Sequence, residues 1–205
     1  MVDQSKHVGI LGGSFNPVHL GHLHLAHELK SRYQLDEVWF IPVYQNPHKL
    51  NRPTVSPFHR LEMLRLAVQD EPSYHVLDLE CKRKGASYTV DTLKYLCGKY
   101  PDNQYYLLLG TDIIKRFHEW KAPHEILQLC KLVIASRGHE NVSLNYGDEN
   151  LKASVMSSFI SIPLLDISST QIRFLVEQGG DFQHLVPAQV YQYIERKGLY
   201  TSDWK

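Results

Sequence analysis

Two histidines three positions apart, His19 and His22, stand in a segment whose composition suits phosphate binding. This segment, residues 12–22, begins with two glycines after an apolar run at 8–11 and leads into a helical pattern. Glycines let a backbone approach a ligand closely, and residues about one turn apart share a helix face. The free N–H groups and the positive dipole end of that helix would attract an anion. The segment therefore predicts a phosphate site at the start of a helix.

A second segment, residues 167–173, also combines a predicted helix start with residues that can bind an anion. Ser168 or Ser169 would cap a helix that ends at two glycines, and Arg173 lies about one turn into that helix. Serine and threonine at a helix start are most often only caps, so this segment alone favours a structural explanation. Taken with residues 12–22, it indicates two helix starts that carry phosphate ligands, which is an arrangement suited to a polyphosphate.

Short apolar runs alternate with helical stripes along the chain. We expect strands at 8–11, 37–43, 74–79, 105–109, 132–136 and 159–165, and helices over 20–29, 61–68, 90–97 and 172–176. Residues 106–109 are apolar without alternation, which is typical of a parallel strand covered on both faces. The pattern predicts an α/β fold, a Rossmann-like, doubly wound and mainly parallel sheet with helices on both faces, in a single domain over 1–205. In such sheets ligands bind beyond the carboxyl ends of the strands, where both segments fall.

Three stretches are expected to lie outside the alternating pattern. Residues 44–57 contain three prolines with basic residues, which predicts a basic surface loop. Residues 138–158 are polar and show no clear periodicity, so we expect a variable excursion there. Residues 168–200 are expected to form a C-terminal helical part.

Composition excludes several classes of protein. Lys plus Arg and Asp plus Glu number 22 each among 205 residues, so no overall field attracts nucleic acid or an anionic membrane. Cys81, Cys97 and Cys130 are odd in number and widely spaced, which argues against a disulfide framework and favours a reducing cytoplasm. No apolar run approaches about 18 residues, so neither a membrane span nor a signal peptide is expected.

The histidine content raises the alternative of a transition-metal site. Four of the twelve histidines lie within residues 19–27. There is no H-E-x-x-H pattern, however, and no cysteine lies near them in the sequence. We therefore interpret His24 and His27 as exposed or packed side chains, and we predict no metal site formed by the protein.

The two segments resemble the two signatures of the nucleotidyltransferase α/β-phosphodiesterase superfamily. They read G-x-F-x-P-x-H-x-G-H at 13–22 and I-S-S-T-Q-I-R at 167–173. Within that superfamily the chain is most similar to the bacterial-type nicotinate mononucleotide adenylyltransferases. Their further marks recur as N-P-H-K at 46–49, S-Y-T-V-D-T-L at 87–93, G-T-D at 110–112, Trp120, L-V-P at 185–187 and G-L-Y at 198–200. The similarity spans nearly the whole chain and is weakest at 137–158.

The resemblance implies a reaction in which ATP and nicotinate mononucleotide give deamido-NAD and pyrophosphate, with Mg²⁺ as cofactor. The attacking phosphate is already mostly dianionic near neutrality, because its second pKa is about 6. No protein nucleophile or strong base is required. The protein has to align two polyanions and to stabilise the charge that develops at the α-phosphorus and the leaving oxygens.

The resemblance also assigns residues to these tasks. His19, His22 and Arg173 are expected to be catalytic, with His22 as the main contact to the transition state. The residues assigned to ATP are Gly12, Gly13, Ser14, Phe15, His19, His22, Gly110, Asp112, Ile167, Ser168, Ser169, Thr170 and Arg173. Those assigned to nicotinate mononucleotide are Asn46, Lys49, Thr89 and Trp120. For Trp120 alone, core packing would be the better interpretation, and an ordinary turn residue is the alternative for Asp112.

The chain departs from the family pattern at two positions. Asn16 stands where many relatives carry Asp, which puts in doubt any role for a charge there, and His48 stands where a second proline is common. Two alternatives also follow from the sequence. A phosphopantetheine adenylyltransferase or cytidylyltransferase of the same superfamily would usually be shorter and lack the 87–93 element. A nucleotide-sensing module without turnover would not need both phosphate motifs. The oligomeric state and the choice between acid and amide mononucleotide stay open.

Overall fold

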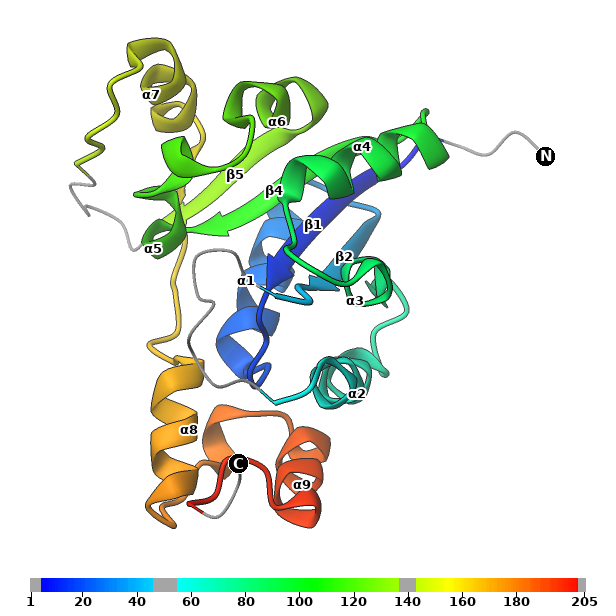
Figure 1. Ribbon diagram of the computed structural model, residues 1–205, viewed down its shortest axis with the longest axis vertical. Coiled ribbons are helices and arrows are strands. Elements are labelled where there is room, and N and C mark those ends of the chain that lie inside the picture. The colour runs from blue at the N-terminus through cyan, green and yellow to red at the C-terminus, as the bar shows by residue number, and fades with distance from the viewer. Residues whose placement is uncertain (1–4, 46–54, 137–142, 203–205) are drawn as a thin grey trace.

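A computed structural model describes residues 5–45, 55–136 and 143–202, apart from the side chain of Asp112. Its six strands form one parallel sheet in the order β3-β2-β1-β4-β5-β6 (Figure 1). The strands are β1 (His7–Gly13), β2 (Glu37–Pro42), β3 (Tyr74–Val76), β4 (Gln104–Gly110), β5 (Lys131–Ser136) and β6 (Phe159–Ser161). This confirms the predicted doubly wound fold. Strand order reverses between β1 and β4, the position where such sheets bind ligands.

Helices cover both faces of the sheet because strand side chains alternate between two cores. Leu11, Val38 and Leu108 face one core, and their neighbours Ile10 and Leu107 face the other. The first core is closed by α1 (Leu20–Arg32), α2 (Pro57–Val68), α8 (Ser169–Glu177) and α9 (Ala188–Lys197). The second is closed by α4 (Thr89–Lys99), α6 (Pro123–Leu129) and α7 (Glu149–Met156).

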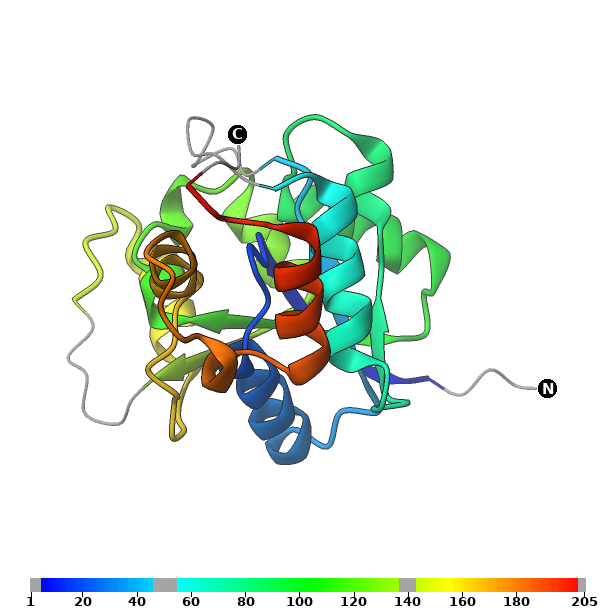
Figure 2. The same cartoon turned by 90° about the horizontal axis from the view of Figure 1, so that it is seen from below.

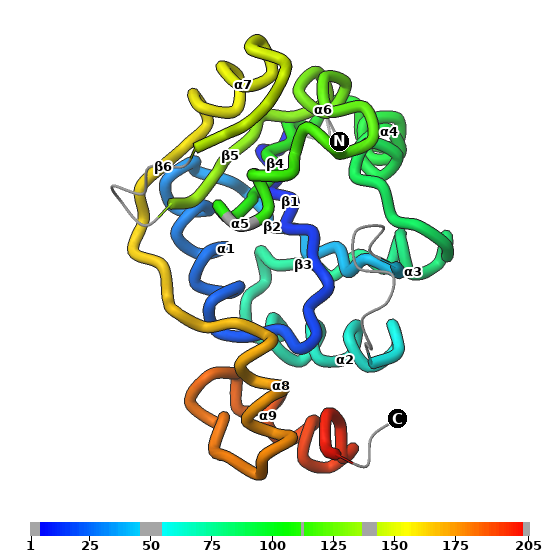
Figure 3. The backbone as a smooth tube through the Cα atoms, turned by 60° about the vertical axis from the view of Figure 1, so that its left-hand side comes forward, coloured from blue at the N-terminus to red at the C-terminus, as the bar shows by residue number. Residues whose placement is uncertain are grey.

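Two predicted strands, those at 74–79 and 159–165, end well before their expected last residue. β3 ends at Val76 because α3 (Leu79–Arg83) begins at the last residue of the predicted strand. β6 ends at Ser161, and the chain then runs beside α1 toward α8 (Figure 3). Arg32 Nη1 donates to Ser161 O at 3.1 Å, and His24 Nε2 hydrogen-bonds to Pro163 O, so this connection is held to α1. In this connection, backbone carbonyl groups hydrogen-bond to side chains of α1 rather than to a neighbouring strand.

The second half of the stretch at 138–158, which the sequence predicts to be a variable excursion without clear periodicity, forms a helix, so the prediction is wrong there. Helix α7 begins after Asp148, whose Oδ1 accepts from Leu151 N–H at 2.9 Å. Its short apolar stripe, Leu151 and Val155, is buried in the second core. Only Leu151 and Val155 of its eight residues are buried, and so short a stripe is too weak a periodic signal to predict a helix. Residues 137–142 and 46–54, including most of the predicted proline loop, lie outside the described residues.

The predicted C-terminal helical part consists of α8, the short helix η2 (Gln183–Leu185) and α9. These helices lie at the end of the molecule seen from below in Figure 2. Helix α9 packs on α2, where His59 Nδ1 and Tyr193 OH are 2.8 Å apart. The remaining short helices, α5 (Thr111–Ile114) and η1 (Phe117–Glu119), follow β4. Within the described ranges, no helix has the length and apolarity needed to cross a membrane.

Candidate active site

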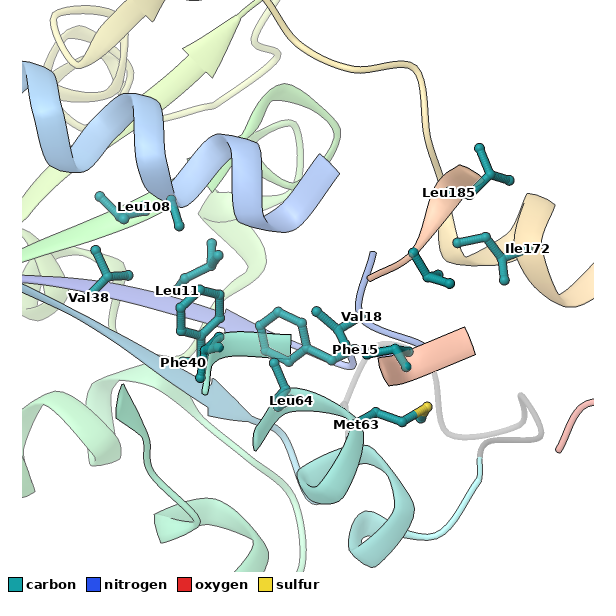
Figure 4. Packing of buried hydrophobic residues seen from close by; sticks show 14 of the residues in the cluster. Leu11, Phe15, Val18, Val38, Phe40, Met63, Leu64, Leu108, Ile172 and Leu185 are labelled. Carbon is teal, nitrogen blue, oxygen red and sulfur yellow. The ribbon is translucent and has the colours of Figure 1, made fainter. Parts of the chain in front are cut away.

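The turn between β1 and α1 is anchored by an aromatic side chain. Phe15 is buried and has a positive φ of 46°. Its ring lies among Val18, Phe40 and Leu64 (Figure 4). A Cβ atom at Gly13 would come within 3.2 Å of this ring, so the glycine makes the close approach possible. The Phe15 side chain therefore serves the core and leaves the backbone of the turn to border a ligand.

His19 and His22 are brought together at the first turn of α1. Their ring centroids are 3.7 Å apart, and His19 N–H donates to His22 Nδ1 at 3.3 Å. Because Nδ1 of His22 accepts, the neutral ring carries its proton on Nε2, which is then available to donate. A Cβ atom at Gly21 would lie 3.1 Å from His19 Nδ1, so this glycine leaves room for the His19 ring.

Burial determines the charge of this histidine pair. It lowers the pKa of His19 from its ordinary value of 6.5 to about 4. The pKa of His22 is lowered well below its ordinary value, first by burial and then by the neighbouring His19. Both rings are therefore neutral near pH 7 in the free protein. They can offer phosphate oxygens N–H donors without the cost of burying two like charges.

The second signature lies directly on the first. Ser169 Oγ donates to Pro17 O at 2.8 Å across 152 positions of sequence, and Arg173 Nη1 donates to Asn16 O at 2.8 Å. Ser168 caps helix α8, with its Oγ accepting from Gln171 N–H, and Arg173 also bonds to Thr170 Oγ1 at 3.2 Å. Ile167 approaches Gly21. The starts of α1 and α8 therefore meet, as the two motifs predicted.

Asn16 has a structural use at the turn after β1. The residue is 4% exposed, and its Oδ1 accepts from Tyr200 OH at 2.9 Å and from Val55 N–H at 3.3 Å. These bonds join the turn after β1 to the chain ahead of α2 and to the C-terminal segment. A charge at this position is not needed for any of them.

A cavity of about 380 Å³ opens beside the turn. Predicted site residues on its wall are Gly12, Gly13, Ser14, Thr89 and Trp120. Its apolar lining includes Ile10, Ile41, Leu93, Leu107, Leu109, Ile113 and Ile126, and its polar lining includes Glu80, Ser87, Thr92, Arg116 and Lys121. An apolar recess with a few polar groups on one wall suits a flat ring that carries polar substituents.

Two residues assigned to nicotinate mononucleotide, Thr89 and Trp120, line this cavity, and their roles stay predictions. Thr89 is the first residue of α4. Trp120 follows η1, packs on Phe117 with ring centroids 5.2 Å apart, and still lines the cavity. Its ring is thus supported from behind, as a stacking surface requires.

The structure describes only some of the other residues assigned to the adenosine and to the mononucleotide. Gly110 ends β4 and is the residue ahead of α5. The Asp112 side chain, Asn46 and Lys49 lie outside the described part of the chain. Their roles stay predictions.

Two buried charged residues beside the site were missed by sequence reasoning. Arg60 of α2 is 1% exposed, and its guanidinium donates to Ser14 O at 2.9 Å, Tyr44 O at 3.2 Å and Val55 O at 3.3 Å. Glu80 of α3 is 6% exposed and lines the cavity. In the sequence, each of the two is a charged residue within or next to an apolar pattern. A charged residue at such a position is more often exposed to solvent, so the pattern gave no reason to select it.

A parallel sheet whose switch point carries two converging helix starts with phosphate-binding residue types defines a nucleotidyltransferase of the Rossmann-like class. The family model described as cytidylyltransferase-like matches residues 10–174. A probable nicotinate-nucleotide adenylyltransferase of Dehalococcoides mccartyi is 43% identical over 96% of this chain and 98% of its own length. The nicotinate-nucleotide adenylyltransferase of Bacillus subtilis is 36% identical over 96% of this chain and all of its own length. The chain therefore belongs to the nicotinate-nucleotide adenylyltransferase family.

Solved structures show the same fold. The nicotinic acid mononucleotide adenylyltransferase of Plasmodium falciparum, complexed with NaAD, superposes with a TM-score of 0.76 at 22% identity. The superposition covers 95% of this chain and 97% of the Plasmodium chain. At that identity the likeness supports the fold alone.

Proposed function

We propose that this protein transfers the adenylyl group of ATP to nicotinate mononucleotide, giving deamido-NAD and pyrophosphate in NAD biosynthesis. The observation that carries the proposal is the contact between the two signatures, through Ser169 on Pro17 and Arg173 on Asn16. It brings two helix N-termini, a histidine pair and an arginine to one edge of the sheet beside the cavity. The family membership supports the same reaction.

The chemistry is a direct displacement at phosphorus. A phosphate oxygen of the mononucleotide forms a bond to the α-phosphorus of ATP. The bond from that phosphorus to the α,β-bridging oxygen breaks, and its electron pair leaves with pyrophosphate. Because the nucleophile is an anion, no residue needs to remove a proton, and the protein contributes alignment and electrostatic stabilisation.

In this mechanism the histidine pair acts as hydrogen-bond donors. The Nε2–H of neutral His22 would bond a phosphate oxygen in the transition state, with His19 beside it. Arg173 and the start of α8, residues 167–170, would hold the β and γ phosphates. The turn at 12–15 would border the nucleotide, with Gly110 and Asp112 beside the adenosine. Donors fixed in place by the fold need no reorganisation as charge develops.

Mg²⁺ would enter this site with ATP. The ion is usually held by substrate phosphates and water with few protein ligands. The donors at the two signatures are imidazoles, hydroxyls and a guanidinium, which suit phosphate oxygens. The described residues hold no group of three His, Cys, Asp or Glu side chains that could bind an ion. When bound, Mg²⁺ would neutralise charge on the leaving pyrophosphate.

The second nucleotide would occupy the cavity. Its pyridine ring would stack on Trp120, with its carboxylate beside the first turn of α4 at Thr89. Asn46 and Lys49 would reach its phosphate from the loop ahead of α2. The three thiols, Cys81, Cys97 and Cys130, are free, which supports placing the reaction in a reducing compartment such as the cytoplasm.

Pyrophosphate release from ATP, Mg²⁺ and nicotinate mononucleotide tests the proposal, with deamido-NAD identified by mass. Parallel reactions replace the mononucleotide with nicotinamide mononucleotide or phosphopantetheine, and ATP with CTP. We expect turnover with ATP and the acid mononucleotide well above every other pair. Equal or faster turnover with phosphopantetheine or CTP would refute the proposal, as would tight ATP binding without any product.

A further inference from the structure

Lys121 is a charged residue on the wall of the cavity to which the mechanism gives no role. It lies between Trp120 and Ala122, and Ala122 is the N-cap of α6 with a positive φ of 51°. A side chain other than glycine is strained in this left-handed region, and the strain persists only where the surrounding structure holds the chain. The contacts of Lys121 therefore show what holds the turn that follows Trp120.

The ammonium group of Lys121 contacts the start of α4. Lys121 Nζ donates to both carboxylate oxygens of Asp91, at 3.0 Å to Oδ1 and 2.9 Å to Oδ2. It also lies over the ring of Tyr88, 4.8 Å from the ring centroid. Tyr88 is the N-cap of α4 and Asp91 lies in its first turn, so these two contacts flank Thr89 in the sequence. One side chain thus joins the turn that carries Trp120 to the turn that carries Thr89.

The two joined segments supply the part of the cavity wall that was assigned to the pyridine ring. Tyr88 and Thr89 come from the start of α4, whereas Trp120 and Lys121 come from the turn ahead of α6, and all four line the cavity. A ring that stacks on Trp120 while its substituent meets α4 requires a fixed spacing between these segments. A small misplacement of positioning groups is costly, because binding depends on their geometry.

The exposure of the ion pair separates a role in positioning from a role in stability. The side chains of Lys121 and Asp91 are 51% and 35% exposed. Exposed ion pairs contribute little to the stability of a fold, because water screens the charges and two flexible side chains lose freedom. A small interaction can still shift the population of one local turn severalfold. Loss of the pair should therefore appear in substrate binding and not in Tm.

A second ion pair between the same parts of the molecule provides an internal comparison. Lys94 Nζ of α4 and Glu125 Oε1 of α6 are 2.8 Å apart, and their side chains are 52% and 39% exposed. In both pairs an acidic residue in the first turn of one helix meets a lysine from the other segment. The described cavity lining includes Lys121 and neither Lys94 nor Glu125. The two pairs are thus alike in exposure and differ in whether they border the cavity.

We propose that Lys121 is a positioning residue for the second nucleotide, because its ion pair with Asp91 holds Trp120 at a fixed spacing from the start of α4. This inference rests on the proposed function for the identity of the ring in the cavity. In this role the ammonium group acts through Asp91 and not as a free charge that attracts the substrate. The two charges compensate each other, so the pair adds no net charge to the wall.

Steady-state kinetics of K121M, D91N and the double variant test this role. We expect each single variant to raise the KM of nicotinate mononucleotide about fivefold, the upper end of what an exposed ion pair contributes. Both kcat and the KM of ATP should stay within about twofold of the native values. The double variant should be no worse than either single variant, because both changes remove the same interaction. K121R can still pair with Asp91 and should stay within about twofold of the native protein.

Lys94→Met and Glu125→Gln are the matched controls and should leave the mononucleotide KM within about twofold. An equal rise in these controls would overturn the inference. So would a rise in K121M without one in D91N, because the charge of Lys121 would then attract the substrate directly. Additive losses in the double variant would contradict a shared interaction. A rise in both KM values together with a lowered Tm would indicate only a structural role and would overturn the inference as well.

Calorimetric titration of nicotinate mononucleotide separates this inference from the function on which it rests. If the native protein binds no mononucleotide, the proposed function and the inference both fail. If the native protein and K121M bind it equally, only the role of Lys121 is overturned. Tighter binding by the native protein than by K121M and D91N alike supports both.

Discussion

The histidine pair shows how burial can prepare a side chain for phosphate without giving it a charge. His19 and His22 stack at the start of α1, and their lowered pKa values keep both neutral. A neutral pair avoids mutual repulsion while the site is empty. A bound polyanion would then act on oriented N–H dipoles and on the positive end of the helix.

Replacing His22 with Ala should lower kcat by on the order of 10²–10³ with a much smaller change in KM, because one donor to the transition state is lost. Steady-state kinetics with both substrates measure this. His27→Ala, an exposed change on the same helix, should leave kcat within about threefold. A kcat for His22→Ala equal to the native value would remove His22 from the mechanism.

Asn16 should matter for stability. Replacing it with Leu keeps a similar shape but leaves Tyr200 OH and Val55 N–H without their acceptor. We expect the free energy of unfolding to fall by about 2 kcal/mol, measured by urea denaturation. In a double-mutant cycle, Tyr200→Phe should recover part of that loss, because it removes the hydroxyl whose bond to Asn16 is lost. Fully additive losses would contradict the bond between the two side chains.

Helix α2 joins the segments that surround the turn. Arg60 donates to carbonyl groups at the end of β1, after β2 and ahead of α2, so one guanidinium fixes three pieces of backbone. A planar group with five donors can do this, whereas an ammonium group cannot span the same positions. Two of these carbonyl groups, those of Tyr44 and Val55, belong to the predicted proline loop at 44–57.

Replacing Arg60 with Lys should therefore disturb the turn even though the charge is kept. We expect the KM of ATP to rise about tenfold and the free energy of unfolding to fall by about 2 kcal/mol. Arg65→Lys, an exposed change on the same helix, is the control. If Arg60→Lys matched the native protein in both measurements, the positive charge alone would explain the residue.

The stability of the whole molecule should depend on pH through the buried histidines. The pKa of His19 is about 4 in the folded protein and near 6.5 when the chain is unfolded. Between these values the unfolded chain binds more protons, so stability is fully present above pH 6.5 and declines as pH falls toward 4. His19 alone should contribute a loss on the order of 3 kcal/mol, and His22 acts in the same direction.

Urea denaturation across pH 4–7 measures this dependence. His19→Asn, which supplies a favourable helix cap without titrating, should flatten the curve. His27→Asn on the exposed side of α1 should leave it unchanged. The same slope in His19→Asn and the native protein would show that other groups cause the acid sensitivity.

What the sequence determined by itself was local. Apolar runs marked six strands, a capping residue marked the start of α8, and two phosphate motifs fell after strands of one parallel sheet. Because parallel strands end at the same edge, their order along the chain was enough to predict that the motifs would meet. The resemblance to a known family then supplied the substrates.

Only the tertiary structure decided which charged residues became buried parts of the site. Arg60 lies at a predicted helical stripe and Glu80 at the end of a predicted strand, and at both positions the sequence predicts a charge exposed to solvent. Tyr200 hydrogen-bonds to Asn16, which is 184 positions away in the sequence. The short helix α3 is packed against β2 and has no periodicity of its own to detect. Sequence patterns report neighbours along the chain, whereas burial and hydrogen-bond partners depend on segments that meet only after folding.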